Sequence, residues 1–287
     1  FDVVKTCYHF GVELLGAWDG PLVCRLVRVV DERLPERDAA CRERLLACQD
    51  LVRERAWGVV CNNAVNTRRW RERYGSGQRV AMVPTGCPAE LPPMGPSPYM
   101  DAGGLPPLLF LGSLAAPRMA DLLSEAAERL RGEAVIHHVG RNKTGFYGAE
   151  RTLSPRIVAH GELPEERVWD FARHARLGLA LAAGPDVFDN DLSKLLSYLR
   201  AGLPVLGEER LANAWLFLRR GFGATFRYGD AVHLREQALA LLQAPPETPG
   251  SDIAAWAATV HSWDRRAAVL AAFLARATEQ PARGPVT

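Results

Sequence analysis

Ser193 and Lys194 stand where backbone and side chains together can bind a phosphate, at the start of a predicted helix. The first turn of a helix leaves N–H groups without partners inside the helix, and the helix dipole places partial positive charge there. An ammonium and a hydroxyl at the same position add a charge and a further donor. The pair therefore predicts a seat for a phosphate-bearing ligand.

Four leucines predict the helix that positions Lys194. They recur at the spacing of one buried helix face, namely Leu192, Leu195, Leu196 and Leu199. Gly202 ends the helix and Pro204 prevents its continuation. The apolar run at 203–206 is typical of a buried parallel strand. We therefore expect a helix followed by a strand, with the phosphate seat at the amino end of the helix.

Three polar residues before this helix are candidates for its N-cap, namely Asp189, Asn190 and Asp191. Oxygens of Asp and Asn accept hydrogen bonds from the free N–H groups of a first turn, and negative charge there opposes the helix dipole. We expect this run to begin the helix.

Composition excludes two classes of protein. The chain has 287 residues, enough for two α/β domains with sizeable cores. Its 48% hydrophobic content and net charge of +2 fit a soluble protein, whereas a nucleic-acid binder carries a stronger, clustered basic excess. No apolar run approaches the roughly 20 residues of a membrane helix. We expect no transmembrane segment, and a peripheral membrane contact stays open.

The six cysteines do not predict a metal site. All lie in the first third of the chain, at Cys7, Cys24, Cys41, Cys48, Cys61 and Cys87. No two form a CxxC pair, and His9 is the only histidine near them, so the spacing does not favour zinc. We expect buried, reduced thiols.

Strands and helices alternate in the first part of the chain. We expect strands at 1–6, 22–30, 57–61 and 80–83, and helices at 10–18, 37–55 and 64–74. This alternation is typical of a parallel sheet, but the strands are too few for a whole doubly wound domain. Because the first residues already form a predicted strand, we expect a further segment upstream of Phe1.

The same alternation continues after a connection rich in proline. Eight of the 20 prolines lie at 84–107, where no apolar period survives, which predicts a stiff linker. Further strands are expected at 108–111, 134–139, 156–159 and 177–182, and helices at 119–130, 164–175, 211–220, 231–243 and 262–276. These patterns divide the chain into a first domain at 1–90, a linker at 91–106, a second domain at 107–260 and a C-terminal helix and tail at 261–287.

Residues 194–205 also resemble the donor-binding helix of the GT-B-fold glycosyltransferases that use nucleotide sugars. They read KLLSYLRAGLPV and depart from the family at Ser197, where a glutamate that binds the ribose is usual. Residues 83–86 resemble the turn that ends the acceptor domain, and residues 110–112 resemble the first strand and turn of the donor domain. Trp263 stands where the C-terminal helix of the family begins. The resemblance implies an α/β GT-B fold with two Rossmann-like parallel-sheet domains facing a cleft, the first incomplete.

The resemblance also implies roles for particular residues. Gly112 would let the pyrophosphate approach the backbone, while Arg118 and Lys194 would balance its charge. Ser113 replaces the first of two basic residues usual in this loop. The donor-binding residues implied are Gly112, Arg118, Gly140, Arg141, Leu163, Ser193, Lys194 and Ser197. The catalytic residues implied are His9 and Asp189.

The activity implied is that of a retaining, family-4-like glycosyltransferase of bacterial carbohydrate biosynthesis in the cytoplasm. It would move a sugar from a UDP- or GDP-linked donor to a glycan, a lipid-linked acceptor or a small molecule. No metal cofactor is expected, because the only DxD-like run, at 189–191, is interpreted as a helix cap. The nucleotide sugar would be a co-substrate, and no nucleic-acid partner is expected.

Two alternatives stay open. Ser113, Ser197 and the short first domain fit a degenerate GT-B protein that binds a nucleotide, or a partner subunit, without catalysis. A nucleotide-sugar epimerase would need cleft carboxylates, and the sequence offers no convincing candidates. A dehydrogenase is disfavoured because no GxGxxG motif follows a predicted strand.

Overall fold

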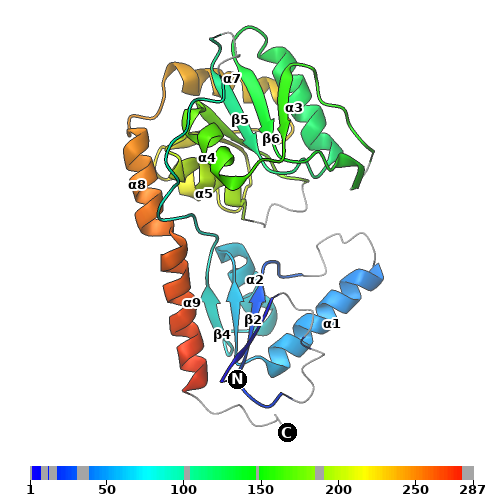
Figure 1. The fold of residues 1–287 in the computed structure, drawn as a ribbon. Helices are drawn as coiled ribbons and strands as arrows, with labels where there is room; N and C mark the ends of the chain where they lie inside the picture. Colours follow the sequence, from blue (N-terminus) through cyan, green and yellow to red (C-terminus); the bar gives the residue numbers. More distant parts are fainter. Residues whose placement is uncertain are drawn as a thin grey trace. The chain divides into compact units, whose positions relative to one another are not determined.

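A computed structural model of the chain describes residues 2–7, 12, 18–30, 39–99, 104–146, 149–184 and 191–279. They fall into two compact units (Figure 1). The smaller unit comprises Phe1–Thr85, Asp189–Asp191 and Trp263–Thr287, and the larger unit comprises Gly86–Phe188 and Leu192–Ser262. Among the described helices, none has both the length and the apolar character needed to cross a membrane.

The smaller unit is built on a four-stranded parallel sheet in the order β1-β2-β3-β4. Its strands are β1 (Val4–Cys7), β2 (Leu22–Leu26), β3 (Gly58–Cys61) and β4 (Arg79–Met82). Helices α1 (Ala39–Arg55) and α2 (Ala64–Tyr74) place Val52 and Trp70 in one core cluster with β2 and β3. Helix α9 (Trp263–Thr278) places Phe273 in a second cluster with Trp57. The central strands are thus covered on both faces, as parallel strands require.

The larger unit is built on a six-stranded parallel sheet in the order β10-β9-β8-β5-β6-β7. Its strands are β5 (Pro107–Leu111), β6 (Val135–Val139), β7 (Ile157–Gly161), β8 (Leu177–Ala180), β9 (Val205–Glu208) and β10 (Gly223–Phe226). The chain starts in the middle of this sheet, builds one side, and then returns to build the other. This is the strand order of a Rossmann-like domain.

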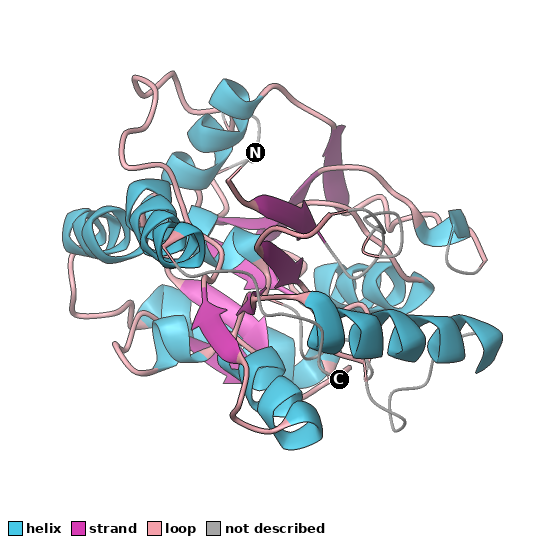
Figure 2. Ribbon diagram, turned by 90° about the horizontal axis from the view of Figure 1, so that it is seen from below, coloured by secondary structure: helices cyan, strands magenta, loops and turns pink. Residues whose placement is uncertain are grey.

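Helices cover both faces of the larger sheet (Figures 1 and 2). Core residues of α3 (Pro117–Arg129) and α7 (Ala231–Gln243) pack together on one face. Those of α4 (Glu165–His174), α5 (Ser193–Arg200), α6 (Trp215–Leu218) and α8 (Gly250–His261) pack on the other. A short 3₁₀ turn, η2, spans Thr144–Phe146.

Three local predictions need correction. Cys7 and Cys41 are exposed rather than buried. Cys7 ends the edge strand β1, and Cys41 lies in the first half of α1, whose buried residues all lie in its second half. The strand predicted at 22–30 ends at Leu26. Neither β10 nor α8 was predicted.

The proline-rich segment packs on the larger unit through side-chain donors. Arg173 donates to the Pro92 carbonyl at 2.8 Å, and Arg200 donates to the Ala89 carbonyl at 2.7 Å. The Tyr99 hydroxyl donates to a carbonyl of α4 at 2.7 Å. Because proline has no N–H, such a segment is fastened through its carbonyl groups rather than through a strand ladder.

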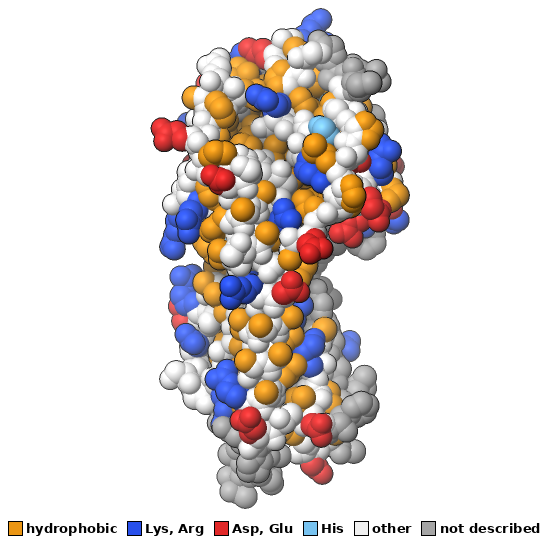
Figure 3. Space-filling view, turned by 60° about the vertical axis from the view of Figure 1, so that its left-hand side comes forward, with side chains coloured by type: hydrophobic (Ala, Val, Ile, Leu, Met, Phe, Trp, Pro, Cys, Tyr) orange, Lys and Arg blue, Asp and Glu red, His pale blue; other side chains and the backbone are white. Residues whose placement is uncertain are grey.

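Charged side chains of both signs are interspersed on the surface. On the face that Figure 3 shows, blue and red side chains of the described residues alternate with apolar ones. No large field of one sign covers that part of the described surface, in keeping with the net charge of +2.

Candidate functional site

The strand order of the larger unit reverses direction between β5 and β8. Connections run to one side from β5 and to the other side from β8, although β5 and β8 are neighbours. Where the order reverses, the two flanking loops leave in opposite directions at the carboxyl ends of the strands. This switch point is the place to look for a ligand site.

Three glycines end β5, β6 and β7 in left-handed backbone conformations. Gly112, Gly140 and Gly161 have φ values of 93°, 143° and 69°. Gly112 N–H donates to Val139 O and Gly140 N–H donates to Gly161 O, both at 2.8 Å. A Cβ at Gly140 would lie 2.3 Å from the Gly112 carbonyl oxygen. Glycine is therefore required at Gly140 for its turn to pack against that of Gly112.

Lys194 extends from the first turn of α5 toward these turns. Its Nζ lies 3.8 Å from the centroid of the Phe110 ring, and a Cβ at Gly112 would lie 3.6 Å from it. Burial lowers the pKa of the ammonium to about 7. Within the part of the chain that the structure describes, no carboxylate pairs with it. Ser193 beside it is exposed.

The predicted cap of α5 is wrong for Asp191. The N-cap residue is Leu192, with no side-chain cap, while Asp191 is oriented toward Asn63 and Thr85 in the smaller unit. Burial raises the pKa of Asp191 to about 6, although hydrogen bonds from the Asn63 side chain and the Thr85 backbone act to lower it. Asp189 and Asn190 lie outside the described residues. Because no side chain of the described residues caps α5, its first N–H groups can face a ligand.

Two side chains hold α5 in place, and neither was predicted. The buried Asn213 brackets Leu192: its Oδ1 accepts from Leu192 N at 3.3 Å, and its Nδ2 donates to Leu192 O at 3.1 Å. The Tyr198 hydroxyl accepts from Leu111 N at 2.8 Å and lies 3.1 and 3.0 Å from two strand carbonyls. A Cβ at Gly178 would lie 2.5 Å from the Tyr198 ring, so the ring rests on bare backbone between β5 and β8.

Arg118 lies at the start of α3 and forms an ion pair with Glu208 at the end of β9. It donates to both Glu208 oxygens and to Ala182 O, and its guanidinium lies 4.1 Å from the centroid of the Tyr228 ring. Glu208 is fully buried and also accepts from two backbone N–H groups. The sequence analysis missed Glu208, although a charged residue that ends an apolar strand is a usable signal.

The remaining predicted residues are spread along the same edge. Arg141 follows β6 and pairs with Glu162 after β7, both exposed. Leu163 packs against the core, and Ser197 is half-buried on α5. The structure therefore brings the predicted donor-binding residues to one end of the sheet. His9 and Asp189, the predicted catalytic residues, lie outside the described residues.

Histidines of β6 and β7 lie next to these glycine turns. His138 Nε2 donates to the Gly112 carbonyl at 3.0 Å, and His137 Nδ1 lies 3.0 Å from His160 Nε2. Burial lowers the pKa of His137 to about 4 and lowers that of His138, so both are neutral at neutral pH. Among the described residues, no group of three or more His, Cys, Asp or Glu could hold a metal ion.

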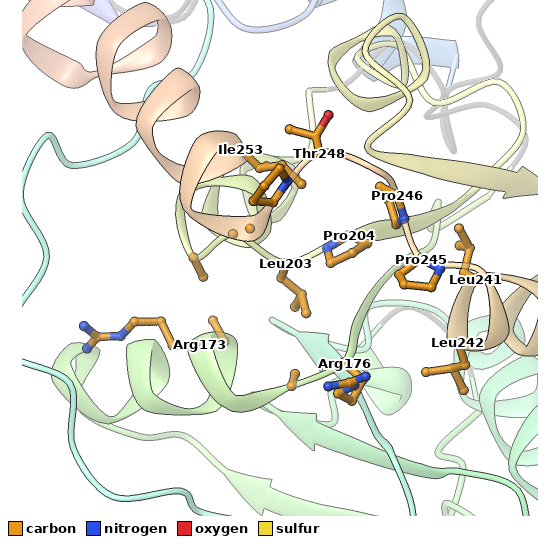
Figure 4. Close-up of a pocket in the computed structure, with 16 residues that line it drawn as sticks. Arg173, Arg176, Leu203, Pro204, Leu241, Leu242, Pro245, Pro246, Thr248 and Ile253 are labelled. Atoms are coloured by element: carbon orange, nitrogen blue, oxygen red, sulfur yellow. The ribbon is translucent and has the colours of Figure 1, made fainter.

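A cavity of about 280 Å³ lies elsewhere in the larger unit (Figure 4). Its lining includes Arg176 and Pro204, which immediately precede β8 and β9, and several apolar residues of the segment between α7 and α8. It therefore lies at the amino ends of these strands, whereas Lys194 and Glu208 lie at the carboxyl edge of the sheet.

No protein-family model and no curated protein matches the sequence. Solved structures do. Sucrose-phosphate synthase from Thermosynechococcus elongatus matches with a TM-score of 0.75 and 16% identity, over 96% of this chain and 73% of that one. HepE from Anabaena in complex with UDP-glucose matches with a TM-score of 0.76 and 14% identity, over 96% and 79%. A glycosyltransferase from Rickettsia africae matches with a TM-score of 0.69 and 11% identity, over 97% and 76%. The predicted architecture is confirmed: this chain has the α/β GT-B fold.

Proposed function

We propose that this chain is a glycosyltransferase whose larger unit binds the diphosphate of a nucleotide-sugar donor at Lys194 and the first turn of α5. The observation that carries the proposal is the half-buried Lys194, whose ammonium lies over the Phe110 ring and beside Gly112 at the switch point of the sheet, without a carboxylate partner among the described residues. A desolvated cation is costly on its own, and a bound anion offsets that cost.

The same arrangement suits sugar transfer. When the bond between sugar and diphosphate breaks, negative charge develops on the leaving diphosphate. A fixed ammonium and the positive end of a helix stabilise that charge without reorganising. These groups supply the charge that a divalent cation would otherwise supply, so the proposal includes a metal-independent site. HepE is known in complexes with UDP and UDP-glucose, which makes a uridine donor the first to test.

A binding assay with a charge-matched control tests this proposal. Titration calorimetry in EDTA would measure the dissociation constants of UDP, GDP, ADP, TDP and the corresponding nucleotide sugars. The proteins compared are wild type, Lys194→Ala and Lys5→Ala. Lys5 is exposed in the smaller unit and carries the same charge. We expect Lys194→Ala to weaken diphosphate binding by roughly 1.5–3 kcal/mol, the scale of a hydrogen bond to a charged group. An unchanged dissociation constant would contradict the phosphate role, and donor binding without any turnover would indicate a binding module instead of an enzyme.

A further inference from the structure

Arg118 and Glu208 form an ion pair at the part of the sheet edge formed by β8, β9 and β10, and the hydrogen-bonding positions of this carboxylate are occupied within the protein. Each Glu208 oxygen accepts one hydrogen bond from Arg118 and one from a backbone N–H. The backbone donors are Ala182 at 2.7 Å and Gly229 at 3.1 Å. A carboxylate has about four acceptor positions, so Glu208 has no capacity left for a ligand.

Arg118 keeps some capacity, but its charge is balanced. Nη1 donates to Glu208 and to Ala182 O, while Nε has no hydrogen-bond partner among the described residues. The Arg118 side chain is 24% exposed and that of Glu208 is 0% exposed. An anion at this edge would therefore meet a guanidinium with a carboxylate immediately behind it. Coulomb energies add, so most of the attraction by Arg118 is cancelled by the repulsion from Glu208.

We propose that Glu208 sets the anion affinity of the donor site by cancelling the charge of Arg118, which leaves Lys194 as the cation that binds the diphosphate. This inference rests on the proposed function and names a specificity-determining residue for it. The two cations belong to neighbouring strands, since Lys194 lies over β5 and Arg118 contacts the end of β8. One bound diphosphate would therefore be within range of both charges.

The charge balance also distinguishes product from donor. A free nucleoside diphosphate carries more negative charge than its sugar ester, because its terminal phosphate ionises twice near neutral pH. A site of low positive charge discriminates less in favour of the more anionic product. Glu208 would thereby favour release of the diphosphate after transfer. Its removal should tighten the binding of UDP more than that of UDP-glucose.

Four variants separate charge cancellation from simple positioning of Arg118. Glu208→Gln removes the negative charge, Arg118→Gln removes the positive charge, and the double variant removes both. Glu209→Gln is the control, because Glu209 is the next residue and is exposed to solvent. Titration calorimetry with UDP and UDP-glucose would give the dissociation constants, and thermal unfolding would report folding.

Charge cancellation predicts that UDP affinity follows the net charge of the pair. Glu208→Gln should bind UDP roughly tenfold tighter and Arg118→Gln roughly tenfold weaker, the size expected for one charge at intermediate distance. The double variant should stay within about threefold of wild type, as should Glu209→Gln. The double variant also avoids a buried uncompensated charge, so it decides the question even if a single variant does not fold.

The opposite order of affinities would overturn the inference. If Glu208 only holds Arg118 against the phosphate, Glu208→Gln binds UDP more weakly than wild type, and the double variant loses at least tenfold. In that case wild type still binds UDP, and the proposed function stands. If neither wild type nor any variant binds a nucleotide, the proposed function fails and this inference fails with it.

Discussion

The two halves of the carboxyl edge of the larger sheet are both formed by parallel strands, but their charges are satisfied differently. Beyond β8, β9 and β10, the chain supplies its own counter-charge, since Arg118 pairs with Glu208 and two backbone N–H groups occupy the remaining acceptor positions of that carboxylate. Beyond β5 and β6, the chain supplies Lys194, bare glycine turns and an uncapped helix end. The first half is complete without a ligand, whereas the second offers a cation and free N–H groups to one. Ligand binding should therefore depend mainly on the second half.

Breaking the glycine turns should have the largest effect on this comparison. Gly140→Ala would place a Cβ 2.3 Å from the Gly112 carbonyl oxygen, in a backbone conformation that alanine disfavours. We expect a loss of roughly 2–4 kcal/mol in the free energy of unfolding, measured by denaturant titration. Gly132→Ala is the control: Gly132 also has positive φ, but nothing lies within 4 Å of its Cβ position. Equal losses in the two variants would show that backbone strain alone, rather than the contact between the turns, requires glycine.

The sequence predicted the fold where local signals agree with one another. Helix α2 was predicted at its observed bounds, since Gly75 marks its end, and the structure adds a second local signal, the Asn63 side chain that caps its start. Strand β10 carries only one buried residue, and α8 begins after Pro249 without a polar cap. Edge strands and uncapped helices leave weak local patterns, so these two elements escaped prediction.

The site was predictable only in part, for the same physical reason. Lys194 and Gly112 mark a helix start and a strand end, and both signals are local. The role of Glu208 depends on its ion pair with Arg118, which is 90 positions away, and no pattern along the chain indicates that the two residues pair. Asp191 was predicted as a cap because the rule for caps is local, whereas Asn63 and Thr85 are distant along the chain. Tertiary partners override such rules.

The boundary between the two halves depends on Tyr198. Tyr198→Phe would leave the buried N–H of Leu111 without its acceptor and should cost about 1–3 kcal/mol in the free energy of unfolding. Because Tyr198 fastens α5 to the sheet, UDP binding should weaken as well. Tyr74→Phe in the smaller unit is the control, since its hydroxyl bonds to the exposed Asp50. If Tyr198→Phe costs no more than the control, the hydroxyl does not position α5.

The pH dependence of UDP binding should report Lys194 directly. In the free protein the Lys194 pKa is about 7, so above pH 7 the protein must take up a proton to bind an anion there. The dissociation constant for UDP should rise by up to about tenfold per pH unit between pH 7 and 9. Lys194→Met should abolish this slope. The stability of the free protein should change with pH in the opposite direction. The unfolded chain binds more protons than the native state over this range, so the free energy of unfolding rises with pH. A flat binding profile in wild type would place the diphosphate away from Lys194.

Releasing the exposed cation Arg141 should have the smallest effect. Its carboxylate partner, Glu162, is 55% exposed, so water and salt already screen the pair. Glu162→Gln should therefore change UDP affinity by less than about threefold and stability by less than about 0.5 kcal/mol. UDP affinity should be measured by calorimetry for Glu162→Gln and Glu208→Gln in parallel, because both variants remove one carboxylate paired with an arginine at the same sheet edge. If the exposed and the buried carboxylate have equal effects, burial is not what gives Glu208 its influence, and the contrast between the two halves reduces to their net charge.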